Sequence, residues 1–341
     1  MLKYLVMAEQ IKVSVLITTY NLEGVIEQAL KSVLGQECGF DYEVIAGDDG
    51  STDRTVEIIK SYADKYPGKI RIFTMPREAG VKYNPVHRAA ANRLNILKEA
   101  RGEYCCFLDG DDHYTDKKRL QRMADILDAH SDCIMCSHNL WMVYENGDKH
   151  KLMRMKKEHK YSLEQYWKLL FLQANALMFR NIYAQHTPTG ALARNFDDNN
   201  ITFWLFKYGK MYYLPECMGA YMQSEGSSWN KMSELQHAAL NMTGYNVEVL
   251  TAPQYRELSD IRHYNDLRVL YEQRGTYGPE DLQPFYDNAK EEGMEEALKA
   301  YGLGKPDPAL EKELGRRLSR AKRGYMLAKA QRAIQKLAGK Y

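Results

Sequence analysis

The chain has 341 residues, 45% of them hydrophobic and 27% charged, with a formal net charge of +2 at pH 7. This composition is ordinary for a globular protein, and the length allows a full α/β core and a second, smaller unit. No apolar run reaches the roughly 20 residues of a membrane span, and the start of the chain lacks a signal-peptide layout. We therefore expect a cytoplasmic protein rather than a secreted or membrane-spanning one.

The first third of the chain alternates between predicted strands and helices. A β-prone run at Val13–Thr18 is followed by residues 23–34, whose apolar side chains recur at helical spacing. Further strands are predicted at 42–46, 70–74 and 105–108, and further helices through 56–62 and 89–100. Such alternation is typical of an α/β fold with a mostly parallel sheet, helices on both faces and ligands at the strands' carboxyl ends.

Three polar clusters, at 18–21, 48–53 and 109–112, directly follow predicted strands. In a parallel sheet all three would open on the same edge. Each cluster alone is also explained by turn and helix-capping residues, as at Asp49-Gly-Ser51. Their coincidence on one edge favours a nucleotide site.

The third cluster carries three carboxylates, Asp109, Asp111 and Asp112, straight after the apolar run Cys105–Leu108. Like charges held together cost energy unless a cation shares them. Mn²⁺ and Mg²⁺ prefer carboxylate oxygen, and Mg²⁺ commonly takes one or two carboxylates together with substrate phosphate. The cluster therefore predicts a metal and diphosphate site, with an acidic turn before a helix near Thr115 as the alternative.

The common phosphate-binding loops are absent from the sequence. No Gly-x-Gly-x-x-Gly follows the first predicted strand, and no Gly-x-x-x-x-Gly-Lys-Ser/Thr occurs. Phosphate charge would then be met by the metal and by a cation such as Arg88. The lack of a basic glycine-rich loop also argues against a nucleotidyltransferase that activates sugar phosphates.

These motifs resemble the family 2 glycosyltransferases over roughly residues 11–230. The matching stretches are Val13-Ser-Val-Leu-Ile-Thr-Thr-Tyr-Asn21, Ser32-Val-Leu-Gly-Gln36, Asp48-Asp-Gly-Ser-Thr-Asp53 and Gly102-Glu-Tyr-Cys-Cys-Phe-Leu-Asp-Gly-Asp-Asp112. The resemblance implies a GT-A fold and an inverting, metal-dependent enzyme that uses nucleotide-diphosphate sugars. It also implies site roles: Thr18 and Tyr20 in the base pocket, Asp49 on the base, Arg88 on the diphosphate, Asp109 on the ribose or metal, and Asp111 as principal ligand of Mn²⁺ or Mg²⁺.

The resemblance further implies a general base near the start of a helix that ends at a glycine before a strand. Residues 197–209 have this layout, with Gly209 at the end and Met211–Pro215 as the strand. Asp198 falls at the family's position, so we expect it to take the acceptor's proton, with Asp197 as the fallback. The alternative is that the two carboxylates simply cap the helix.

One departure from the family concerns the metal site. The family often has a histidine where this chain reads Tyr221-Met-Gln-Ser224. Metal binding would then rest on Asp111, the diphosphate and water, with Glu225 as a candidate helper, while Ser227 and Ser228 still match the family's loop. The departure keeps open a second hypothesis, a catalytically degenerate relative that serves as a binding or scaffold protein.

The acceptor side is less defined by sequence. Residues 161–179 predict an aromatic amphipathic helix and a strand, which would contact a sugar acceptor or form ordinary core packing. By resemblance the donor nucleotide is UDP, and the acceptor is a glycan or a lipid-linked sugar in the synthesis of cell-surface polysaccharide or lipopolysaccharide. We expect no nucleic-acid partner.

The C-terminal region carries the chain's basic character. We predict a catalytic domain at 1–240 and a helical region at 241–341, in which residues 316–340 hold nine Lys or Arg and no acid. Apolar residues recur at helical spacing there: Leu310, Leu314, Leu318, Ala321, Tyr325 and Ala328. A cationic amphipathic helix of this kind either lies on an anionic membrane through residues 306–341 or packs on the domain with a solvated basic face.

Overall fold

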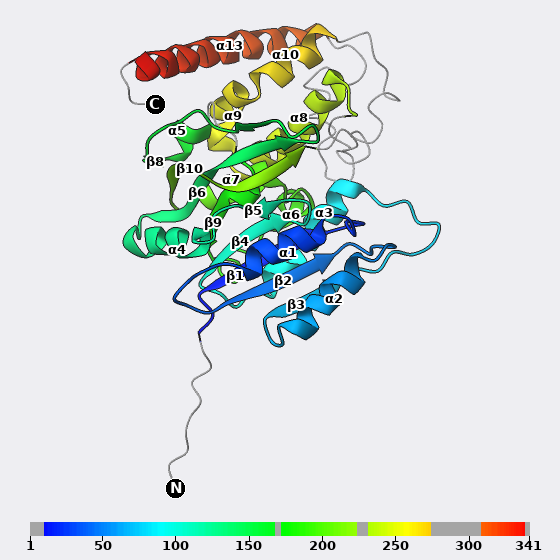
Figure 1. The fold of residues 1–341 in the computed structure, drawn as a ribbon. Coiled ribbons are helices and arrows are strands. Elements are labelled where there is room, and N and C mark those ends of the chain that lie inside the picture. The colour runs from blue at the N-terminus through cyan, green and yellow to red at the C-terminus, as the bar shows by residue number, and fades with distance from the viewer. Residues whose placement is uncertain (1–9, 168–171, 224–230, 274–307, 338–341) are drawn as a thin grey trace. The chain divides into compact units, whose positions relative to one another are not determined.

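The computed structural model describes residues 10–167, 172–223, 231–273 and 308–337 (Figure 1). They form two compact units. We call residues 1–161, 172–188 and 196–223 the sheet unit, and residues 162–171, 189–195 and 224–341 the helical unit. The predicted boundary at residue 240, between a catalytic domain and a helical region, stays a prediction. The helical unit includes two segments from earlier in the chain, and every residue after Gln223 belongs to it.

The sheet unit contains one sheet whose strand order is β3-β2-β1-β4-β9-β6-β10-β5, with β7 paired to β6 and β8 to β10. The first four strands are mutually parallel, and β9 runs antiparallel to both of its neighbours. The bounds are β1 Val13–Thr19, β2 Tyr42–Asp48, β3 Ile70–Thr74, β4 Tyr104–Asp109, β5 His113–Tyr114, β6 Cys133–Tyr144, β7 Lys149–Lys151, β8 His159–Tyr161, β9 Leu177–Arg180 and β10 Lys210–Gln223. The α/β fold class is thus confirmed.

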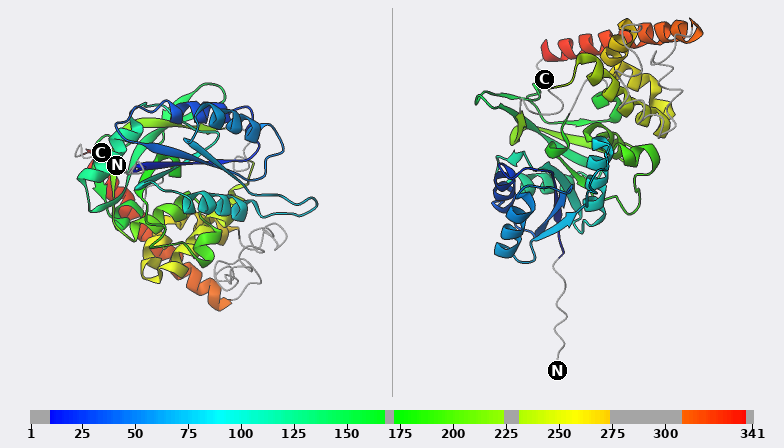
Figure 2. Two further views of the ribbon diagram at one scale, coloured as in Figure 1. Left: turned by 90° about the horizontal axis from the view of Figure 1, so that it is seen from below. Right: turned by 90° about the vertical axis from the view of Figure 1, so that its right-hand side faces the viewer.

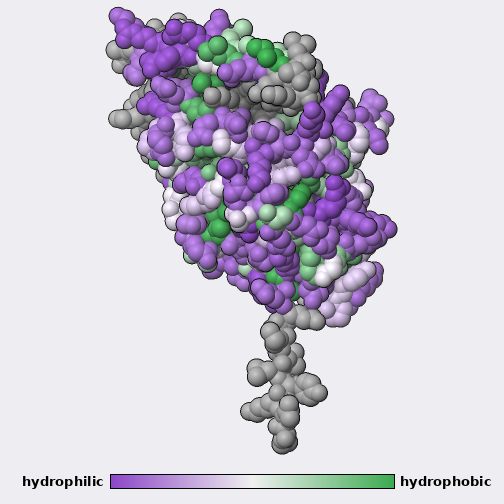
Figure 3. All heavy atoms as spheres, turned by 90° about the vertical axis from the view of Figure 1, so that its left-hand side faces the viewer, coloured by the Kyte–Doolittle hydropathy of each residue, from purple (hydrophilic) through white to green (hydrophobic). Residues whose placement is uncertain are grey.

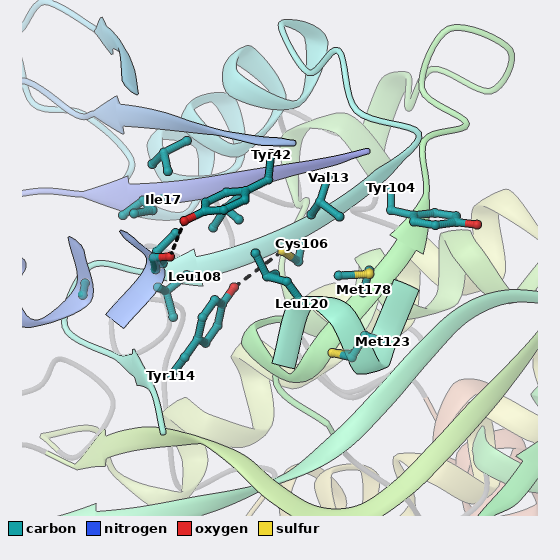
Figure 4. Packing of buried hydrophobic residues seen from close by; sticks show 14 of the residues in the cluster. Val13, Ile17, Tyr42, Tyr104, Cys106, Leu108, Tyr114, Leu120, Met123 and Met178 are labelled. Carbon is teal, nitrogen blue, oxygen red and sulfur yellow. Dashed lines mark hydrogen bonds between the residues drawn. The ribbon is translucent and has the colours of Figure 1, made fainter. Parts of the chain in front are cut away.

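Helices cover both faces of this sheet (Figure 2, left). Their bounds are α1 Ile26–Leu34, α2 Thr55–Lys65, α3 Pro85–Lys98, α4 Arg119–Ala129 and α7 Asp198–Phe206, with a short 3₁₀ turn η1 at Ala174–Ala176. Because strand side chains alternate between faces, Val13, Val15 and Ile17 of β1 join one core with the apolar sides of α1, α2 and α4. Figure 4 shows part of this core, including the hydroxyl of Tyr114 directed at the sulfur of Cys106.

Several predicted bounds shift in the structure. The helix expected near Thr115 begins at Arg119, and the strand expected at Met211–Pro215 runs on to Gln223. Of the expected helix after Tyr161, the described part is α5, Leu163–Trp167, and residues 168–171 lie outside the described ranges. Tyr166 and Met178 from that stretch are buried, which fits core packing rather than an exposed sugar-binding surface.

The helical unit is built from α5, α6 (Gly190–Arg194), α8 (Glu234–Thr251), the 3₁₀ turn η2 (Pro253–Tyr255), α9 (Arg256–Arg262), α10 (Tyr264–Glu272) and α13 (Pro308–Leu337). Its core joins α8, α10 and α13, and Leu314 of α13 is part of it. Ala321 and Ala328 of α13 are buried as well. The predicted apolar stripe of the tail therefore faces protein, and contact of the tail with a membrane stays a prediction. Within the described ranges, no helix is both long and apolar enough to cross a bilayer.

A buried carboxylate, Glu43, joins the amino-terminal end of β2 to its neighbours. It is 1% exposed and accepts hydrogen bonds from Ser14 Oγ at 2.7 Å and from Arg101 Nη2 at 2.6 Å. Arg71 Nη2 lies 3.0 Å from the same carboxylate. Burial alone would raise the pKa of Glu43, but the hydrogen bonds from Arg101 and Ser14 and the charge of Arg71 lower it below its usual value.

We predict that Glu43→Ala lowers the free energy of unfolding by about 3 kcal/mol at neutral pH, because it removes one partner of a buried ion-pair network. A lowered folded pKa means that this stabilisation is present above the unfolded value of about 4.3 and fades as the pH falls through the folded pKa. Urea unfolding at pH 7 and in acid would measure it. The exposed Glu57→Ala is the matched control, and an equal loss in both variants would contradict the prediction.

Candidate active site

The carboxyl ends of β1, β2 and β4 bring the three polar clusters together at one edge of the sheet. Thr18 pairs in register with Asp109, and Thr19 with Asp48. The hydroxyl of Thr18 donates to Asp109 Oδ1 at 2.6 Å. The expectation from a parallel sheet, that these clusters share an edge, therefore holds.

The first two loops at this edge are joined by hydrogen bonds from backbone N–H groups to side-chain oxygens. Asn21 N donates to Ser51 Oγ at 2.9 Å, and Thr52 N donates to Asn21 Oδ1 at 2.8 Å. Asp48 accepts from Gly50 N at 3.0 Å within its own turn. Gly50 has a φ of +75°, and a Cβ there would lie 2.8 Å from the carbonyl oxygen of Met75. These hydrogen bonds and the conformation of Gly50 fix the shape of the two loops, and they do not involve the side chain of Asp49.

Asp49, the predicted base-binding residue, is held by two arginines. Arg77 Nη2 lies 2.5 Å from Asp49 Oδ2, and Arg88 Nη2 lies 2.5 Å from Asp49 Oδ1. The guanidinium of Arg77 stacks 4.1 Å from the ring centre of Tyr20, and that of Arg88 lies 4.7 Å from the ring of Tyr83. Arg88 is therefore a partner of Asp49 in this structure, and its predicted contact with a diphosphate stays a prediction.

The three carboxylates that follow β4 occupy three different environments. Asp109 is paired with Thr18 and Arg93, Asp111 is exposed, and Asp112 is 1% exposed. Asp112 accepts from Met222 N at 2.8 Å, which ties the end of β10 to this loop. Desolvation and then the charge of Asp109 raise the pKa of Asp111 to about 6, although its side chain stays open to water.

Arg93 of α3 joins Asp109 to Asp198. Its Nη2 lies 3.2 Å from Asp109 Oδ1 and 3.8 Å from Asp198 Oδ1, and its side chain is 13% exposed. Desolvation would lower the pKa of Arg93, but the charges of Asp109 and Asp198 raise it. The guanidinium therefore remains a fixed positive charge between the end of β4 and the start of α7.

Asp198, the predicted general base, is the first residue of α7, and Asp197 is its N-cap. The side chain of Asp197 accepts from Asn200 N, whereas Asp198 Oδ1 is buried and makes no hydrogen bond within the described structure. Desolvation raises the pKa of Asp198 to about 7, and the charges of Asp109 and Asp197 add to the shift against the lowering effect of Arg93. A carboxylate with this pKa can accept a proton near neutral pH. The capping role falls to Asp197.

The carboxylates after β4 supply the type of ligand that a hard divalent cation prefers. Asp109 and Asp111 offer oxygen donors on one loop, and Mg²⁺ needs only one or two protein carboxylates when a substrate phosphate completes its shell. No group of three or more His, Cys, Asp or Glu able to hold a metal occurs among the described residues. Ser224, Glu225, Ser227 and Ser228 lie outside those residues. The donor set fits a metal shared with a diphosphate better than a closed protein cage.

Tyr221 extends the site along β10. Burial raises its pKa, and the charges of Asp198 and Asp112 add to this while hydrogen bonds with Gln223 and Gln173 oppose it. Tyr221 therefore lies within electrostatic range of the candidate base.

Two residues of this site, Arg77 and Arg93, were missed by sequence analysis. Arg93 follows Arg88 by five residues on α3, so the two guanidinium groups leave the helix in different directions, Arg88 to Asp49 and Arg93 to Asp109. Spacing on the helix shows that they diverge but not which one faces the carboxylates. Arg77 lies in a loop, where no periodicity places a side chain.

Comparison with known proteins identifies the class. Residues 14–187, just over half of the chain, match the model of glycosyl transferase family 2, and the chain belongs to this family. Its fold is that of the GT-A glycosyltransferases.

Particular relatives share shorter stretches with this chain. An uncharacterised protein of Mycobacterium tuberculosis is 37% identical over 136 residues, which are 40% of this chain and 37% of the relative. The poly(ribitol-phosphate) beta-N-acetylglucosaminyltransferase TarS of Staphylococcus aureus is 32% identical over 125 residues, 36% of this chain and 20% of TarS. The matches thus span well under half of these relatives.

Solved structures resemble the chain over most of its length. TarS residues 1–349 in complex with UDP-GlcNAc superpose with a TM-score of 0.58 at 19% identity, covering 95% of this chain and 92% of that one. The mannosyltransferase PcManGT of Pyrobaculum calidifontis, in complex with GDP-Man and Mn²⁺, has a TM-score of 0.50 at 16% identity, covering 94% and 88%. At these identities the likeness shows the fold.

We predict that Arg93→Met destabilises the protein by about 3 kcal/mol at pH 8, because Asp109 and Asp198 then lose their shared cation. At pH 5 the loss shrinks, since Asp198, with a pKa of about 7, is protonated there and needs no cation. Thermal unfolding at both pH values measures the difference. Arg54→Met, whose side chain is 73% exposed, is the control, and a loss independent of pH would rule out this electrostatic role.

Proposed function

We propose that the protein is an inverting, metal-dependent glycosyltransferase that moves a sugar from a nucleotide-diphosphate donor to a glycan or lipid-linked acceptor. The observation that carries the proposal is Asp198: its buried oxygen makes no hydrogen bond within the described structure and lies 3.8 Å from Arg93. A titratable group with a shifted pKa beside a specific charge, at the ligand edge of an α/β sheet, is a candidate catalytic group. Family membership supports this class of reaction.

The donor would lie over the carboxyl ends of β1, β2 and β4. Tyr20 and Asp49 offer an aromatic face and a carboxylate to a base, and Thr18 donates a hydrogen bond to Asp109. We infer UDP as the nucleotide, in line with the UDP-GlcNAc bound to TarS, although the PcManGT complex holds GDP-Man. Arg77 and Arg88 already neutralise Asp49, so a base would have to share or displace these cations.

Asp111, with Asp109, would hold Mn²⁺ or Mg²⁺. A divalent cation at this position would supply positive charge to the departing diphosphate. The side chain of Asp111 is exposed and can reach a ligand in solvent, whereas Asp112 is buried and accepts a hydrogen bond from Met222 N. This difference in exposure supports Asp111 as the principal ligand of the metal.

The transfer step follows from the position of Asp198. The acceptor hydroxyl oxygen attacks the anomeric carbon, the bond from that carbon to the phosphate oxygen breaks, and the nucleoside diphosphate leaves with the electron pair. The hydroxyl proton passes to Asp198. A single displacement from the face opposite the leaving group inverts the anomeric configuration. Arg93 keeps Asp198 from being fully protonated at neutral pH, because its charge lowers the pKa that burial raises.

We infer that the glycan belongs to the cell surface, as polysaccharide or lipopolysaccharide. TarS is described as acting on poly(ribitol-phosphate). The competing hypothesis, a degenerate binding or scaffold protein, predicts donor binding without turnover.

We predict that Asp198→Asn lowers turnover of the donor by about 100-fold to 10,000-fold and leaves nucleotide binding intact, because it removes only proton transfer. Asp111→Asn should instead weaken binding of the nucleoside diphosphate in the presence of Mn²⁺. Calorimetry with a panel of nucleoside diphosphates, and release of nucleoside diphosphate from the matching sugar donors, measure the two effects. Asp64→Asn on the exposed side of α2 is the control. Full activity in both site variants would rule out the mechanism.

We predict that kcat/KM falls on the acidic side of its pH profile with a single ionisation, that of Asp198. Since its pKa is about 7, kcat/KM should fall about tenfold for each pH unit below 7 and level off above it. Donor turnover measured between pH 5 and pH 9 tests this, with nucleotide binding measured alongside to correct for effects on the donor site. A profile that stays flat down to pH 5 would contradict the assignment of Asp198 as base.

A further inference from the structure

The long helix α13 carries a charge excess that the proposed reaction does not use. Residues 308–337 contain nine Lys or Arg and two Glu. At about 1.5 Å per residue, the 30 residues of this helix extend for about 45 Å. A helix this long and this basic presents a large cationic surface.

The inner side of α13 packs against the rest of the helical unit. Leu314, Ala321 and Ala328 are buried, and Arg317 is 9% exposed. Arg317 Nη2 donates to Asp260 Oδ1 at 2.7 Å and to the hydroxyl of Tyr245 at 2.7 Å. One of the nine cations therefore holds the helix in place, and the apolar stripe is not open to another partner.

The outer side has two parts that follow each other along the helix. Its first part is cationic, with exposed Arg316, Arg320, Lys322 and Arg323, and Arg320 makes one long contact, 4.0 Å, with Glu257. Its second part is apolar, with Met326, Leu327 and Ile334 exposed by 57%, 65% and 65%. We call these seven residues the outer face of α13. Figure 3 shows the hydrophilic and then hydrophobic side chains over this helix at the top of the view.

Exposed large aliphatic side chains next to a cluster of arginines need an occupant that is anionic and apolar at once. A phospholipid bilayer with anionic headgroups offers both, because phosphate groups meet the cations and acyl chains receive Leu327 and Ile334. Nucleic acid would match the charge, but its phosphate backbone gives aliphatic side chains nothing to bury against, and the outer face holds no aromatic ring for base stacking.

We propose that the outer face of α13 binds the surface of an anionic phospholipid bilayer. The helix lies along the interface while its inner side stays docked on the helical unit. This proposal goes beyond the proposed reaction and does not depend on it, because binding to lipid is measured without donor or acceptor. It would confine the protein to the surface on which a lipid-linked acceptor is found.

Flotation of the full chain with vesicles tests the proposal. The probes are vesicles of phosphatidylcholine alone and vesicles of phosphatidylcholine mixed with phosphatidylglycerol. The wild-type protein should float only with the anionic vesicles. The variant Arg316→Gln/Arg320→Gln/Arg323→Gln should bind them about 100-fold more weakly, since each cation near an anionic surface adds favourable energy. The control Lys60→Gln/Lys98→Gln/Lys118→Gln removes three exposed charges elsewhere and should bind like wild type.

A second variant, Leu327→Ser/Ile334→Ser, keeps every charge and should still weaken binding at least about tenfold, because it removes the inserted side chains. Both residues are exposed, so thermal unfolding should stay as in wild type. No flotation of wild type, equal flotation with uncharged vesicles, or equal loss in the control would overturn the proposal. So would unchanged vesicle binding by both α13 variants, or binding of duplex DNA in place of vesicles that is lost in the arginine variant.

Discussion

The structure depends on how one sheet edge holds several carboxylates together. Asp109, Asp111, Asp112 and Asp198 lie at this edge, and the partly buried guanidinium of Arg93 lies against two of them, Asp109 and Asp198. Carboxylates this close resist ionisation unless cations or hydrogen bonds compensate them. The protein compensates Asp109 with Arg93 and Thr18, fixes Asp112 by hydrogen bonds, and leaves Asp111 and Asp198 only partly compensated. In the proposed mechanism, this partial compensation is what lets Asp111 bind a metal and Asp198 accept a proton.

The three carboxylates that follow β4 thus have three different surroundings. Asp112 braces the end of β10, Asp109 anchors α3 to β1, and Asp111 points to solvent. At the start of α7, Asp197 and Asp198 also have different roles: Asp197 caps the helix, and Asp198 faces Arg93. Adjacent identical side chains leave the backbone in different directions, so their surroundings, and not their identity, decide what each can do.

Much of the fold and part of the site could be predicted from the sequence. Strand and helix periodicity predicted the parallel half of the sheet, and the parallel direction of its strands predicted that Thr18, Asp49 and Asp109 share one edge. The mixed half of the sheet was harder to predict, because β9 lies antiparallel between β4 and β6, and its partners are distant in sequence. Arg93 was missed because tertiary packing alone decides which arginine of α3 meets the carboxylates. The inner and outer sides of α13 were likewise undetermined, since both carry apolar residues and only packing selects the buried one.

The most direct measurement is the titration of the Asp198 carboxyl by ¹³C NMR, with its signal identified by its loss in Asp198→Asn. If desolvation and the balance between Arg93 and the nearby carboxylates poise this group as a base, it should titrate at about 7. A midpoint near the ordinary aspartate value of about 3.9 would show a solvated or simply ion-paired carboxylate, and the proposed base would then have to be abandoned.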